Sequence, residues 1–141
     1  KGFSMGKFSR LSGQLGVVYK VNIDFEIEEI EALLRIKPSK FWRKDDLRKD
    51  GKPYGFSHFE IGYVDEYDPY VFNMMKKTIE PLKDKINVLL EIQNRYHVEM
   101  YLEVVPEIYH GNPTPCLAPD KEVIEFLHRA NVEIDIDLYV Y

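Results

Sequence analysis

The chain has 141 residues and a formal net charge of −5, with 45% hydrophobic and 30% charged residues. This length and composition fit one globular domain rather than a disordered, fibrous or multidomain protein. The negative charge repels a polyanion and no apolar run reaches the roughly 20 residues that span a bilayer, so we expect neither a nucleic-acid nor a membrane partner.

The amino-terminal residues Lys1-Gly2-Phe3-Ser4-Met5 fit vector-derived residues ahead of a native start at Met5. We therefore treat residues 1–14 as an N-terminal segment and residues 15–141 as a single α/β domain. A domain of this size buries roughly 68% of its unfolded surface, which supports a core without metal or disulfides.

Two strands and one helix are predicted in the first half of the domain. Residues 15–24 alternate between apolar and polar side chains, which is typical of a strand with one side in water. Residues 25–36 repeat apolar side chains at helical spacing and end before Pro38, so they predict a helix. A charged connection over residues 37–53 then leads to a second strand over residues 54–64.

A long helical stripe follows the signal Asp68-Pro69 and reaches about residue 96. Pro81 lies inside this stripe, and an internal proline removes a backbone donor and clashes with the preceding turn. We therefore expect a break or kink near Thr78–Pro81. Residues 97–108 then alternate as a third strand.

The last part of the chain predicts a loop, a helix and a strand. Residues 109–119 are rich in turn formers, and Pro119-Asp120 opens a helix that reaches about Arg129. Residues 132–141 alternate throughout and predict a fourth strand. The side chains of this strand that we expect to face the core are Val132, Ile134, Ile136, Leu138 and Val140.

The predicted order of elements is β-α-β-α-β-α-β. Strands covered by helices on both faces read as continuous apolar runs, whereas these strands alternate and are half-buried. We therefore predict an α+β fold of the two-layer α/β sandwich type. It has one four-stranded, mostly antiparallel or mixed sheet with helices on one face and the other face open to water or to a partner.

Carboxylates and tyrosines share one side of the third and fourth predicted strands. These residues are Glu99, Tyr101, Glu103, Glu133, Asp135, Asp137 and Tyr139. If the two strands are neighbours, the open face is acidic. Such charges keep an open sheet soluble and prevent edge pairing, and they also suit a basic protein partner that tyrosine side chains anchor. A divalent-metal site is a weaker interpretation because the sequence has no calcium-binding loop motif.

No nucleotide-binding, hydrolase or close-spaced histidine motif occurs, so we expect no cofactor, no metal and no catalytic residue. The single cysteine, Cys116, excludes an intrachain disulfide and fits a reducing compartment, most simply the cytoplasm.

His58 and Glu60 share one side of the second predicted strand. The alternative to protein binding is a small-ligand or enzymatic site between the loops 37–53 and 109–119. Its candidate residues are Trp42, Arg43, His58, His110 and Asn112.

The run Ile36-x-Pro38-x-x-x-Trp42-Arg43-Lys44-Asp45 and the turn Gly111-Asn112-Pro113 before a final helix and acidic strand form a recognisable pattern. Over residues 15–140 the chain resembles the bacterial domain-of-unknown-function family 4279. Asp45-Asp46 stands where that family often has Gly-Asp, and Phe56 stands where it often has tryptophan. The resemblance implies a fold without an assigned reaction, and some families of this kind act as immunity proteins in toxin systems.

These observations favour a non-catalytic, immunity-protein-like binding module that uses the acidic, tyrosine-bearing sheet face, with a basic protein as partner. A homodimer formed through the same open face is a further hypothesis.

Overall fold

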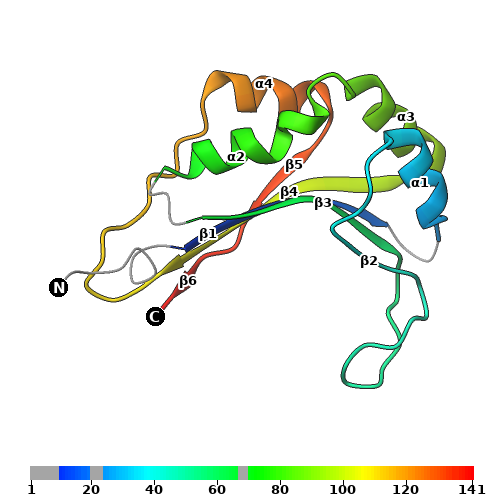
Figure 1. Cartoon of the computed structure of the whole chain (residues 1–141), viewed down its shortest axis with the longest axis horizontal. Coiled ribbons are helices and arrows are strands. Elements are labelled where there is room, and N and C mark those ends of the chain that lie inside the picture. The colour runs from blue at the N-terminus through cyan, green and yellow to red at the C-terminus, as the bar shows by residue number, and fades with distance from the viewer. Residues whose placement is uncertain (1–9, 20–23, 67–69) are drawn as a thin grey trace.

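The computed structural model describes residues 10–19, 24–66 and 70–141. Over these residues the chain is a mixed α+β fold with four α-helices and one open six-stranded sheet (Figure 1). Within the described ranges, none of the helices has the length and apolar character needed to cross a membrane.

The strands are β1 (Arg10–Tyr19), β2 (Lys40–Trp42), β3 (His58–Glu66), β4 (Val98–Ile108), β5 (Glu133–Ile136) and β6 (Tyr139–Val140). The helices are α1 (Ile27–Leu34), α2 (Val71–Ile79), α3 (Ile86–Tyr96) and α4 (Lys121–Arg129), with a 3-10 turn η2 (Glu80–Leu82) between α2 and α3.

The sheet has the order β2-β3-β1-β4-β5, and β6 pairs with the far end of β4. The β2–β3, β3–β1 and β1–β4 pairs are antiparallel, whereas β5 and β6 lie parallel to β4. The prediction of four strands was therefore wrong. A three-residue strand such as β2 is too short to show a period, and the last predicted strand is interrupted at residues 137–138.

β1 begins at Arg10, before the alternation that starts at Leu15. The pattern missed this first half because Gly13 contributes no side chain and because a bulge shifts the pairing between β1 and β3 there. Gly62 of β3 lies at the bulge with a φ of +67°, a conformation that glycine adopts without strain. The predicted strand continued to residue 24. Residues 20–23 lie outside the described residues, and Asp24 is not part of a strand.

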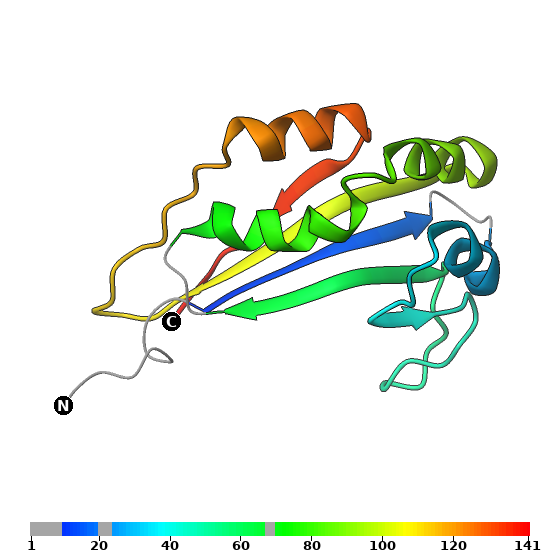
Figure 2. The same cartoon turned by 45° about the horizontal axis from the view of Figure 1, so that its top comes forward.

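The helices lie together on one side of the sheet, and the other side carries none of them (Figures 1 and 2). The predicted break near Thr78–Pro81 is confirmed, since α2 ends at Ile79 and η2 follows. The predicted start at Asp68-Pro69 lies outside the described residues, and α2 begins at Val71. At α4, the Asp120 carboxylate accepts a hydrogen bond from the Val123 backbone N–H at 3.1 Å and caps the helix.

The core lies between the helices and the covered face of the sheet. Leu15, Phe59 and Leu102, from three adjacent strands, are fully buried there. The expectation that the last strand faces the core holds for Val132, which is buried. It is wrong for the side chains that follow: Ile134, Ile136, Leu138 and Val140 are 42%, 38%, 44% and 71% exposed. β5 is an edge strand and β6 lies beyond the helices, so the core covers little of either.

Candidate functional surface on the open sheet face

Strand pairing gathers the predicted acidic and tyrosine residues on the helix-free face. Along β4 the buried and partly exposed side chains alternate, which turns Tyr101 and Glu103 away from the core. The parallel register then places Glu133 beside Tyr101 and Asp135 beside Glu103. The sequence pattern thus identified which side chains of each strand share a face. The pairing of β4 with β5 then brings the side chains of the two strands together.

The acidic surface continues toward the carboxyl-terminal end of β4. Tyr139 of β6 pairs with Glu107, and its hydroxyl donates a hydrogen bond to the Asp137 carboxylate at 3.0 Å. Glu99 lies at the opposite end of the same face of β4. We call the set Glu99, Tyr101, Glu103, Glu133, Asp135, Asp137 and Tyr139 the acidic face.

Tyr101 lies at the centre of the acidic face. Burial first, and then the negative charges of Glu103, Glu60, Asp135 and Glu99, together raise the pKa of Tyr101 to about 12. The phenol is therefore neutral at physiological pH, and its half-buried ring and O–H group suit a contact that is apolar at one end and polar at the other.

Gly16 of β1 connects the acidic face to a second cluster on β3. Gly16 pairs with Tyr101 on one side and with Glu60 on the other. A Cβ atom at this position would lie 3.3 Å from Cζ of Tyr101 and 3.4 Å from Cε1 of His58. The absence of a side chain therefore allows both rings to lie against β1. A glycine inside an alternating strand is the sequence signal that marks such a close approach.

A buried polar pair lies beside Gly16. Nε2 of His58 and Oε1 of Glu60 are 2.8 Å apart, and the two residues are only 3% and 7% exposed. No helix covers this face, so side chains on the face itself bury the pair. Trp42 stacks on His58 at 4.1 Å between ring centroids, and Tyr54 stacks on Trp42 at 4.3 Å.

Two buried nitrogen atoms in this cluster lack a hydrogen-bond partner in the described part of the chain. They are Nε1 of Trp42 and Nδ1 of His58. When Nε2 of His58 donates to the Glu60 carboxylate, Nδ1 of the neutral ring is an acceptor and the Trp42 indole N–H is a donor. Buried polar atoms without partners are uncommon in folded proteins.

The five residues predicted for a ligand site do not meet. The structure brings Trp42 and His58 together, but the Arg43 guanidinium is directed away and pairs with Glu28 of α1. His110 and Asn112 follow β4 at the end opposite to Glu99, whereas His58 is aligned with Glu99 through β1. The 11 residues of β4 rise about 35 Å, so the loops 37–53 and 109–119 lie at opposite ends of the sheet.

The 109–119 loop instead folds onto the carboxyl terminus. The His110 backbone N–H donates to the Tyr141 carbonyl at 2.8 Å, and the rings of Tyr109 and Tyr141 stack at 5.1 Å. Cys116 is exposed, and its carbonyl accepts a hydrogen bond from the Val71 backbone N–H at 3.2 Å. These contacts explain the position of the loop without a ligand.

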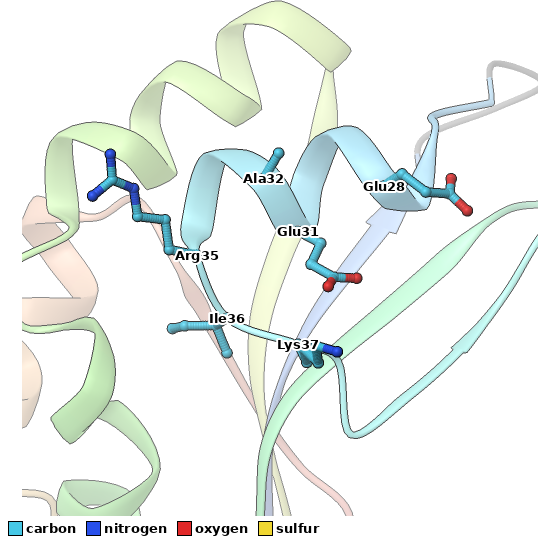
Figure 3. Close-up of a pocket in the computed structure, with 6 residues that line it drawn as sticks. All are labelled: Glu28, Glu31, Ala32, Arg35, Ile36 and Lys37. Atoms are coloured by element: carbon cyan, nitrogen blue, oxygen red, sulfur yellow. The ribbon is translucent and has the colours of Figure 1, made fainter.

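A hollow of about 420 Å³ lies beside α1 (Figure 3). Its lining residues are Glu28, Glu31, Ala32, Arg35, Ile36 and Lys37. Most of these side chains are exposed and their charges are of both signs, so the hollow does not select a charge on a ligand. In residues 10–19, 24–66 and 70–141, no three side chains of His, Cys, Asp or Glu come close enough together to hold a metal ion.

Sequence reasoning missed Tyr54 and Gly16, although both contribute to the open face. Tyr54 lies near the end of the β2–β3 connection, and its stacking on Trp42 depends on how that connection returns to the sheet. The Asp45 backbone N–H donates to the Tyr54 carbonyl at 2.9 Å, which fixes this return. No periodicity in the sequence records such a contact.

No curated protein matches the chain, and no solved structure matches it either. The model of one family, DUF4279, a domain of unknown function, matches residues 11–141. Since this match covers both faces of the sheet and all the helices described above, the chain belongs to the DUF4279 family.

Proposed function

We propose that this protein is a non-catalytic binding module whose acidic face docks a basic protein. The observation that carries the proposal is the pairing of β4 with β5, which joins Tyr101, Glu103, Glu133 and Asp135 into one block on the face without helices. Grouped carboxylates accelerate encounter with a positively charged surface, and a central tyrosine supplies contact area.

The charges around Tyr101 support this proposal. After burial, the charges of three carboxylates of this face, Glu103, Asp135 and Glu99, and of the neighbouring Glu60 raise the pKa of its hydroxyl, so negative charge is concentrated around the centre of the face. On the helix side, several acidic side chains pair with cations of the same chain. Lys83 bridges Glu80 and Glu122, and Lys76 lies 2.7 Å from Asp120.

A charge-reversal pull-down tests the proposal. The double variant Asp135→Lys with Asp137→Lys inverts exposed charge on the acidic face. The matched control, Asp84→Lys with Glu125→Lys, changes the net charge by the same amount on exposed residues of the helix side. We expect the first variant to lose the captured partner and the control to retain it, with both folded by circular dichroism. Equal capture by both variants would show that the acidic face is not the binding site.

A second candidate function is a small-ligand site at the Trp42–His58 stack. Its support is the pair of unpartnered nitrogens, Nε1 of Trp42 and Nδ1 of His58, in adjacent stacked rings. The indole N–H resonance of Trp42, the single tryptophan, reports on this site directly. A fragment screen in which no compound shifts that resonance would eliminate the candidate.

A further inference from the structure

β5 is the last strand in the sheet order, and its outer edge pairs with no other described strand. The Asp137 backbone N–H donates to the Val104 carbonyl at 2.9 Å. Because backbone groups alternate in direction along a strand, those of Asp135 and Glu133 also point toward β4. The N–H and C=O groups of Ile134 and Ile136 therefore point outward, where they can pair with an added strand.

Apolar side chains line this edge on the helix side. Ile134 and Ile136 are exposed there, and Leu138 after β5 and Ile124 of α4 are exposed as well. On α4, Glu122 lies on the side that faces Lys83 of the α2–α3 connection. Ile124 is two residues further along the helix and is therefore directed to the opposite side, toward the sheet edge.

The arrangement of the helices leaves space beside this edge. α2 packs on β1 and β3, near the middle of the sheet, and α4 packs on β5 (Figure 2). The described chain places no further helix or strand beyond β5. An added strand at this edge would bury its apolar side chains against Ile134, Ile136 and the flank of α4.

We propose that the β5 edge receives an extended segment of the partner in which Lys or Arg alternates with apolar residues. This inference rests on the proposed function, since it takes the basic partner as given and specifies how that partner binds. Paired residues on adjacent strands share a face of the sheet, so basic side chains of the segment would lie beside Glu133 and Asp135. In the described part of the chain, no cation forms an ion pair with either carboxylate.

Charge also argues against a second copy of this chain as the occupant. Two copies could pair antiparallel through their β5 strands. A two-fold axis through Asp135 would then place Asp135 opposite Asp135 of the second copy. An axis through Ile134 would place Glu133 of one copy opposite Asp135 of the other. Like charges directly opposite each other destabilise a strand pair. A basic segment instead places positive charges beside Glu133 and Asp135, so the charges across the strand pair attract each other.

Peptide binding measured by fluorescence anisotropy tests the inference. The probe is a labelled octapeptide of alternating Lys and Val, and its control is a peptide of the same composition with the four Lys and the four Val in separate blocks. At low salt we expect the alternating peptide to bind the wild-type protein at least about tenfold more tightly than the block peptide. Equal affinities would overturn strand addition, and this comparison needs no protein variant.

Two substitutions of one residue separate backbone pairing from side-chain contact. Ile136→Pro removes the outward N–H and places a ring in its position, whereas Ile136→Thr keeps the N–H and the branched side chain. We expect the proline variant to bind the alternating peptide about tenfold more weakly, and the threonine variant to lose about threefold or less. Circular dichroism and thermal unfolding check that both variants are folded.

The outcomes distinguish this inference from the proposed function. In one outcome, Asp135→Lys abolishes peptide binding while Ile136→Pro has no effect and the block peptide binds as tightly as the alternating peptide. Charge alone then binds the peptide, so strand addition is wrong and docking on the acidic face is supported. If Asp135→Lys has no effect on binding, the proposed function itself fails. A concentration-dependent dimer in sedimentation velocity that Ile136→Pro dissolves would overturn the inference in favour of self-pairing.

Discussion

Replacing His58 with leucine should destabilise the fold by about 3 kcal/mol at neutral pH. His58 contacts Glu60 through Nε2 at 2.8 Å, and both residues are more than nine-tenths buried. Removing one partner of a buried pair costs about 3–5 kcal/mol because the other is left uncompensated. Loss of the stack on Trp42 adds about 1 kcal/mol to this destabilisation. Removal of Nδ1, a buried nitrogen without a partner, reduces the destabilisation by about 1–3 kcal/mol.

A double-mutant cycle measured by urea unfolding checks this reasoning. The second single variant is Glu60→Leu, and the double variant carries both leucines. The double variant no longer contains an unpaired buried carboxylate, so we expect it to be more stable than His58→Leu alone by about 1–2 kcal/mol. Circular dichroism in water confirms that each variant is folded before unfolding. Strictly additive effects would refute the conclusion that His58 compensates the burial of Glu60.

Three further predictions concern the sheet. Gly62→Ala should destabilise the protein by about 1–2 kcal/mol in thermal unfolding, because the φ of +67° strains any residue with a Cβ atom; Gly55→Ala, at a position with open space and no positive φ, should cost almost nothing. Gly16→Val should cost about 1–3 kcal/mol, since its Cβ would press on the rings of Tyr101 and His58, and Tyr101→Ala in the same chain should recover part of that loss. Tyrosinate absorbance should show a component that ionises near pH 12 and that is lost in Tyr101→Phe. Asp135→Asn should lower the pKa of this component by removing a negative charge. Because this pKa lies above that of an unfolded tyrosine, its contribution to stability is complete below about pH 10 and is lost as the pH rises toward 12.

The acidic face shows how far periodicity can reach. Alternation along residues 97–108 and 132–141 identified which side chains share a face, because the period of a strand is independent of its neighbours. It did not determine that β5 lies beside β4, parallel to it. That pairing follows from the path of α4 across the sheet, and it decides that Asp135 lies beside Glu103.

The candidate ligand site shows a feature that loop composition does not predict. The five candidate residues were grouped because they lie in or near the two long loops: Trp42, Arg43, His58, His110 and Asn112. The two loops emerge at opposite ends of the sheet, because β1 and β4 are long strands that run between them. Sequence separation and composition carry no information about which end of a sheet a loop occupies.

The sequence by itself determined the helix break at Pro81, the alternation of β4 and the faces of the strands. All of these depend on local stereochemistry and on the period of one element. Only the tertiary structure decided that β5 is an edge strand, which leaves Ile134 and Ile136 exposed although their pattern predicts burial. Alternation states which side of a strand is apolar. The elements packed around the strand determine whether that side is covered.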